Sequence, residues 1–181
     1  MNCPSCGAPM RLQDGREGLT CDYCKSVYFP EKNDDGIRIL DEPSELSCPV
    51  CAVPLVHAIL DAHQILYCTR CRGSLIPAPT FVLILRDLRA HRADTSAAPH
   101  PPDPKELQRH IQCPQCHRAM DTHYYAGPGN IVIDDCPWCE LNWLDAGELM
   151  VIVRAPDHSC DCGGWGGGDS IWEYTADLSS Q

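Results

Sequence analysis

The sequence lacks the features of a secreted or membrane-spanning protein. No apolar run approaches the roughly 20 residues needed to cross a bilayer, and the longest candidate covers only residues 81–85. The first residues, Met-Asn-Cys-Pro, contain no apolar core of a signal peptide. We therefore expect a cytoplasmic protein that is kept reduced and makes no contact with a membrane.

Aromatic residues and cations are also scarce. Phe occurs only twice among 181 residues, which is too few bulky side chains to build several hydrophobic cores. Modules shorter than about 40 residues usually need a disulfide or a metal ion for stability. Lys and Arg total 14 against 25 Asp and Glu, which gives a net charge of −11. Because nucleic-acid affinity depends on cations that contact phosphate, this charge favours a protein partner with a basic surface over nucleic acid.

Cysteine, in contrast, is abundant. Of 14 Cys, 12 form six Cys-x-x-Cys pairs: Cys3/Cys6, Cys21/Cys24, Cys48/Cys51, Cys68/Cys71, Cys113/Cys116 and Cys136/Cys139. In a reduced chain this pattern predicts metal sites rather than disulfides. Four thiolates fill the coordination shell of Zn²⁺, so we predict three structural zinc ions and no catalytic residue. Rubredoxin-like iron and redox-active dithiols are the alternatives. With zinc bound, the net charge falls to about −17.

The pairs group into three similar modules. Each begins with Cys-Pro-x-Cys, and gaps of 14, 16 and 19 residues separate its two pairs. Alternating apolar runs with turn residues between them predict a β-hairpin in each module, at 10–12 and 19–21, 55–60 and 64–68, and 123–125 and 131–134. The predicted fold is small, metal-stabilised and mainly β, with three tandem zinc ribbons and short helices after the second and third. We therefore expect three rigid bodies that are joined by flexible linkers.

Composition predicts the boundaries of these modules. We expect ribbons at 1–40, 44–91 and 109–155, where the second and third ranges include their helices. An acidic stretch with Pro43 at 33–45 and a proline-rich stretch at 92–108 are predicted linkers, and 156–181 is predicted to be a flexible, acidic, glycine-rich tail.

Two helix starts have recognisable signals. Asp145 and Glu148 have the spacing of a capping box, with Asp145 at the N-cap and Glu148 reaching back. Pro79 is suited to the first turn of a helix after the second module, with Phe81, Ile84 and Leu85 on one face.

The third module also resembles a known family. The stretch from Cys113-Pro-Gln-Cys116 through Cys136-Pro-Trp-Cys139 to Trp143-Leu-Asp-Ala-Gly-Glu-Leu149 is similar to the prokaryotic "transcription factor zinc-finger" family, whose ribbons are likened to that of transcription factor IIB. The resemblance implies a zinc ribbon and suggests a link to transcription. It is weaker over 48–90, and 3–30 resembles only a generic zinc ribbon. The family usually has two glycines after the last Cys, where this chain has Glu140 and Leu141.

Three further groups of residues are candidate sites. His158, Cys160 and Cys162 could hold a fourth zinc ion, or could be exposed residues of the tail. The tail aromatics Trp165, Trp172 and Tyr174 could form a docking motif. A local excess of arginine could contact phosphate, or could be a solvated helix face: Arg70, Arg72, Arg86 and Arg89.

These observations favour a non-enzymatic zinc-binding adaptor that mediates protein–protein interaction, and the resemblance suggests transcription machinery as its partner. Direct nucleic-acid binding in transcription regulation is one alternative. A thiol redox or metal-handling protein is the other, because the chain contains so many paired thiols.

Overall fold

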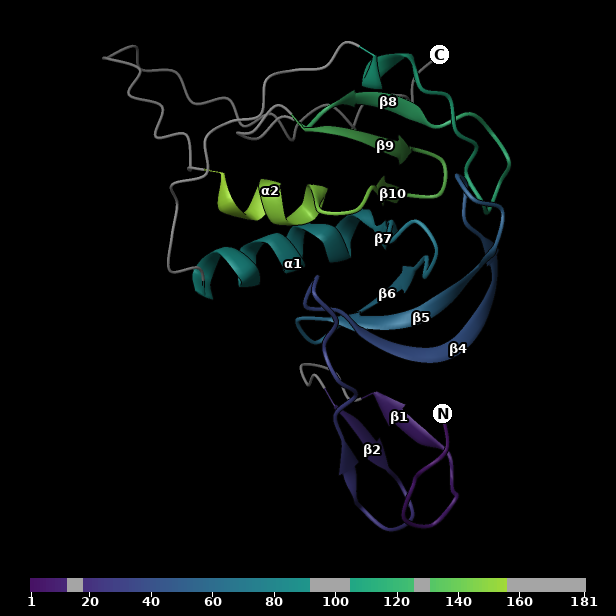
Figure 1. Cartoon of the computed structure of the whole chain (residues 1–181), viewed down its shortest axis with the longest axis vertical. Helices are drawn as coiled ribbons and strands as arrows, with labels where there is room; N and C mark the ends of the chain where they lie inside the picture. Colours follow the sequence, from purple (N-terminus) through teal and green to yellow (C-terminus); the bar gives the residue numbers. More distant parts are fainter. Residues whose placement is uncertain (13–17, 92–104, 126–130, 156–181) are drawn as a thin grey trace, which may run out of the picture.

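The computed structural model describes residues 1–12, 18–91, 105–125 and 131–155, and this part of the chain is mainly β, as predicted. Two sheets are present (Figure 1). The smaller sheet has the order β1-β2-β3, and the larger has the order β4-β5-β6-β7-β10-β9-β8. The strands are β1 (Met10–Leu12), β2 (Leu19–Cys21), β3 (Val27–Tyr28), β4 (Arg38–Ser47), β5 (Pro54–Leu60), β6 (His63–Tyr67), β7 (Ser74–Pro77), β8 (Asp121–Tyr124), β9 (Val132–Cys136) and β10 (Leu141–Leu144).

Three units can be defined by their strands. The N-terminal unit contains β1–β3, the central unit β5–β7 and the C-terminal unit β8–β10. The N-terminal unit lies apart at one end of the molecule and is connected to the rest through β4 (Figure 1). Its small core combines its own Met10 and Leu19 with Leu40 and Ile59 of the larger sheet.

The central and C-terminal units are joined in one sheet, so the prediction of three separate rigid bodies is wrong for these two. Strand β7 pairs antiparallel with β10 over four residues of each strand. The sequence shows that each unit contains a hairpin, but it does not show that the third strands of two units form a ladder with each other. A continuous sheet holds the two units in a fixed relative orientation.

This pairing has approximate two-fold symmetry. Leu75 and Trp143 each lie four positions after the last Cys of their unit, and they pair with each other. On either side, Ser74 pairs with Leu144 and Ile76 with Asn142, so equivalent positions exchange across the Leu75–Trp143 pair. The internal repeat of the sequence therefore has a structural counterpart, which is a ladder between two copies of one strand.

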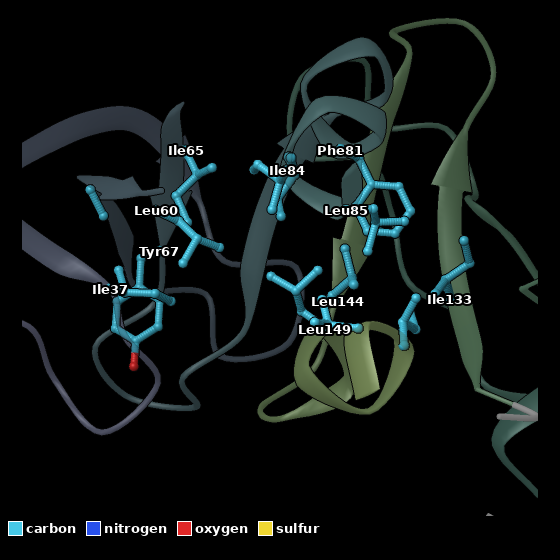
Figure 2. Packing of buried hydrophobic residues seen from close by; sticks show 14 of the residues in the cluster. Ile37, Leu60, Ile65, Tyr67, Phe81, Ile84, Leu85, Ile133, Leu144 and Leu149 are labelled. Atoms are coloured by element: carbon cyan, nitrogen blue, oxygen red, sulfur yellow. The ribbon is translucent and has the colours of Figure 1, made fainter. Parts of the chain in front are cut away.

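Helices cover one face of the larger sheet. Helix α1 (Ala78–His91) follows β7 and helix α2 (Glu148–Arg154) follows β10, and the two contact each other. Figure 2 shows Phe81, Ile84 and Leu85 of α1 directed toward Leu144 and Leu149. None of the helices in the described ranges is long and apolar enough to cross a membrane. A short 3-10 helix (Glu106–Gln108) precedes the C-terminal unit.

The acidic segment predicted as a linker at 33–45 instead contributes an edge strand. Strand β4 pairs antiparallel with β5, and the register shifts on both sides of Pro43. A proline cannot donate a ladder hydrogen bond, so it is tolerated on an edge strand or at a bulge. The composition of this segment resembles that of a linker because its edge position permits acidic residues and proline.

The predicted capping box at the start of α2 is half correct. The backbone N–H of Asp145 donates to the Glu148 carboxylate at 2.6 Å, as predicted. The Asp145 side chain does not cap the helix. It accepts a hydrogen bond from the Trp143 indole N–H at 3.1 Å and pairs with Arg109, while Gly147 occupies the N-cap position with φ 86°.

Candidate metal centres

The structure gathers the 12 paired cysteines into three groups of four. The groups are Cys3/Cys6/Cys21/Cys24, Cys48/Cys51/Cys68/Cys71 and Cys113/Cys116/Cys136/Cys139, and within each group all Sγ atoms lie within 4.8 Å of one another. The nearest pairs have Sγ–Sγ distances of 3.5 to 3.6 Å. A tetrahedral ion with metal–sulfur bonds of about 2.3 Å requires about 3.8 Å. The donor set and its spacing fit one four-coordinate metal ion per group.

All six Cys-x-x-Cys segments have the same backbone form. The residue after the second Cys has a positive φ, between 53° and 76°, in Gly7, Lys25, Ala52, Arg72, His117 and Glu140. In five of the six, its N–H donates to the carbonyl of the first Cys at 2.8 to 3.0 Å. This reversal directs both sulfurs of a pair to the same side. His117 therefore has a local backbone role, since histidine tolerates this conformation better than most residues.

Backbone amides face several of the sulfurs. The N–H of Cys51 donates to the Sγ of Cys48 at 3.3 Å, and the N–H of Cys71 donates to the Sγ of Cys68 at 3.5 Å. At Cys116, the N–H of Arg118 lowers the thiol pKa to about 7. Hydrogen bonds of this kind favour the thiolate, which is the form that binds a metal.

The site in the N-terminal unit is the most exposed of the three. Cys6 and Cys24 are exposed, whereas the corresponding cysteines of the other two sites are half-buried. A serine hydroxyl contacts two sulfurs of this site, since Ser26 Oγ lies 3.1 Å from the Sγ of Cys3 and 3.0 Å from that of Cys24. The hydrogen bond from Ser26 is the main reason that the pKa of Cys3 falls to about 6.

The other two sites share one apolar cluster. The eight cysteines of the central and C-terminal units pack with Leu55, Leu75, Met120 and the fully buried Trp143. The Trp143 ring lies against the backbone of Gly73, where an added Cβ would meet ring atom Cζ2 at 2.2 Å. Trp143 of one unit therefore fills the space that a side chain at position 73 of the other would need.

This contact explains a difference between the two copies. Gly73 and Leu141 each lie two positions after the last Cys of their unit. Glycine is required in the central unit because Trp143 crosses it, whereas the C-terminal unit faces the smaller Leu75 and can carry a leucine.

The candidate arginine group is not gathered into one site. Arg72 forms a bidentate pair with Asp35, with N–O distances of 3.0 and 2.7 Å. Arg86 pairs with its neighbour Asp87, and Arg89 donates to the carbonyl of Ile152 in α2. These three side chains are engaged in contacts within the chain. Arg70 and Arg72 both lie at the Cys68/Cys71 knuckle and both are exposed, but Arg72 is paired with Asp35. The remaining candidates, His158, Cys160, Cys162, Trp165, Trp172 and Tyr174, lie outside the described residues.

Sequence reasoning missed a buried acidic network in the C-terminal unit. Asp134 is 4% exposed and accepts a hydrogen bond from the Thr122 hydroxyl at 2.5 Å, with the Arg109 guanidinium 3.7 Å away. Arg109 also pairs with Asp145. Burial raises the pKa of Asp134, and it raises that of nearby Glu148 to about 8. Arg109 lies just before the first Cys pair, in a segment with no pattern that distinguishes it from a linker.

No family model, curated protein or solved structure matches the chain.

Proposed function

We propose that this protein is a non-enzymatic zinc-binding adaptor that presents rigid apolar side chains to a protein partner. The supporting observation is the position of its exposed apolar residues. Tyr23, Val50 and Trp138 are each the third residue of a Cys-x-x-Cys segment, with exposed fractions of 83%, 49% and 72%. A metal ion bound to the flanking cysteines fixes the backbone on both sides of each residue.

The coordination supports a structural role for the metal. Four cysteines converge in each group, which leaves no open position for water or substrate on a tetrahedral ion. Within the described ranges the three groups contain only cysteine ligands, which suits zinc. Zinc content measured by elemental analysis and native mass spectrometry should be three ions per chain from these groups, without iron. A fourth ion would indicate a site at His158, Cys160 and Cys162.

Trp138 is the exposed knuckle residue best suited to contact a protein partner. The Arg118 guanidinium stacks 4.4 Å from the centre of its ring, on one face, and both side chains are exposed. Tryptophan, tyrosine and arginine are enriched among the residues that dominate binding energy. A tryptophan ring buries a large area with little loss of conformational entropy. A net charge of −11, before the zinc thiolates are counted, favours a partner with a basic surface around this contact.

The family resemblance supports the same proposal. The Trp-Leu-Asp-Ala-Gly-Glu-Leu segment that carries it has a structural role at almost every position. Trp143 occupies the symmetric pair, Asp145 accepts from its indole, Gly147 has φ 86° and Glu148 closes the turn. We propose membership of the transcription factor zinc-finger family on this basis, with transcription machinery as the context of the partner.

The test compares exposed residues in different places. Proteins that co-purify with the zinc-loaded full chain from cells should be lost with Trp138→Ala and retained with Val82→Ala, which removes an apolar side chain that is 52% exposed on α1. Equal loss or equal retention for both variants would refute a docking role for Trp138. Binding of the full chain to duplex or single-stranded nucleic acid at low salt would instead support the nucleic-acid alternative.

A further inference from the structure

The third strand of the N-terminal unit lies at the edge of its sheet in the part of the chain that the structure describes. In the central and C-terminal units the third strands, β7 and β10, pair with each other. The equivalent strand β3 pairs only with β2 among the described residues. Among the described residues, the same structural element thus has a strand partner on both edges in two units and on one edge in the third.

Val27 of β3 and Phe29, the residue that follows the strand, are exposed where their equivalents in the other two units are buried. Ile76 and Leu144, five positions after the last Cys of their units, are 0% and 1% exposed under the helices. The residue at the same position in the N-terminal unit is Phe29, which is 56% exposed. Val27, three positions after Cys24, is 45% exposed. The chain continues from Phe29 toward β4 rather than into a helix, so no helix from this unit covers them.

The register of the existing ladder defines how two β3 strands would meet. In β7 and β10 the residue four positions after the last Cys pairs with its own equivalent. For β3 that residue is Tyr28, so Tyr28 would face Tyr28 of a second copy and Val27 would face Phe29. Aromatic and β-branched pairs of this kind stabilise antiparallel strands.

Charges at the two ends of this register are complementary. Lys25 and Glu31 are both exposed and lie three positions before and after Tyr28. Both lie outside β3, and Lys25 is in a turn with φ 59°, so an antiparallel arrangement centred on Tyr28 brings Lys25 of each copy to the same end of the ladder as Glu31 of the other. Arg38 donates to the carbonyl of Pro30, and its guanidinium carbon lies 5.9 Å from the centre of the Phe29 ring.

We propose that β3 pairs antiparallel with β3 of a second copy of this chain, about a two-fold axis at Tyr28. The N-terminal units would thus form between molecules the ladder that the other two units form within one. The strand is short and no helix adds to the contact, so the buried area falls below the ~1,200 Å² of standard interfaces and the dimer is weak. A dimeric adaptor of this kind presents two copies of each exposed residue of the Cys-x-x-Cys segments, Tyr23, Val50 and Trp138.

Sedimentation velocity of the zinc-loaded full chain, from low micromolar to near-millimolar concentration, tests this arrangement. We expect reversible, concentration-dependent dimerisation that Val27→Lys abolishes and Val82→Lys leaves unchanged. The control adds the same charge at an exposed valine on α1. Zinc content, measured for each variant, establishes that the N-terminal unit is folded.

Charge exchange tests the register itself. Lys25→Glu places like charges at both ends of the ladder and should weaken the dimer about 5- to 10-fold, and adding Glu31→Lys should restore it. Glu140 occupies the same positive-φ position in the C-terminal unit, so the backbone accepts glutamate there. A monomer at every concentration, a dimer indifferent to Val27→Lys, or a double variant weaker than Lys25→Glu would each overturn the proposal.

Discussion

Gly73 provides a sharp test of how the central and C-terminal units are held together. The substitution Gly73→Ala would place a methyl group 2.2 Å from Trp143 Cζ2, whereas carbon atoms normally contact at about 3.5 to 4.0 Å. The ring would have to move by more than about 1 Å, yet it is fully buried among eight cysteines and apolar residues. Overpacking of a rigid core costs about 1–3 kcal/mol, and expulsion of a buried aromatic about 3–5 kcal/mol. We expect a loss of about 2–4 kcal/mol.

The chain contains a matched control for this substitution. An added Cβ at Gly18 would also clash with an aromatic ring, at 2.6 Å from Phe29. That ring is 56% exposed and can swing outward, so Gly18→Ala should cost less than about 1 kcal/mol. Neither glycine has a positive φ, so the substitutions differ in the freedom of the opposing ring rather than in backbone strain.

Scanning calorimetry of the zinc-saturated protein, with metal content measured in parallel, distinguishes the outcomes. For a body of about 100 residues, the expected loss lowers Tm by about 10 °C or more in Gly73→Ala. Adding Trp143→Leu, which copies the Leu75 of the other unit, should recover part of the loss because the clash is removed. If Gly73→Ala and Gly18→Ala have the same small effect, the account of Gly73 is wrong.

Three further predictions follow from the sites. Arg109→Ala should lower the free energy of unfolding, measured by urea denaturation, by about 3 kcal/mol, because it leaves Asp134 buried without its cation. Arg118→Ala removes an exposed guanidinium and should have little effect. Equal effects of the two substitutions would contradict this prediction. Burial raises the pKa of Glu148 to about 8 in the folded state, above the usual 4.5. The unfolded chain therefore loses this proton at lower pH than the folded chain, and the free energy of unfolding falls as the pH rises from 4.5 to 8. Glu148→Gln, which keeps an acceptor for the Asp145 N–H, should therefore be more stable relative to wild type at pH 8 than at pH 6, and a difference independent of pH would count against it. A chromogenic chelator should remove one zinc ion well before the other two, and Cys6→Ser should eliminate this fast phase, because Cys6 and Cys24 are the exposed ligands.

The sequence by itself determined the local chemistry of this protein. Six Cys-x-x-Cys pairs with fixed spacing predicted three groups of four ligands, and the structure brings those 12 cysteines together. Strands β1 and β2 were predicted with their observed ends, since apolar residues bounded by turn residues depend only on nearby positions. The return contact of Glu148 was also predicted, because a capping interaction spans three residues.

Tertiary structure decided how these local pieces are combined. Strands β3, β4, β7 and β10 are short or acidic, and each exists because another strand lies beside it, which no local pattern records. The side chain of Asp145 was predicted to cap α2, but it accepts hydrogen bonds from Trp143 and Arg109 instead. Arg109 lies 36 residues before Asp145 in the sequence. The requirement for glycine at position 73 comes from a tryptophan 70 positions later. A local sequence pattern determines which hydrogen bonds and metal contacts a residue can make with residues near it in the sequence. The packing of one unit on another determines which of these contacts form in the folded protein.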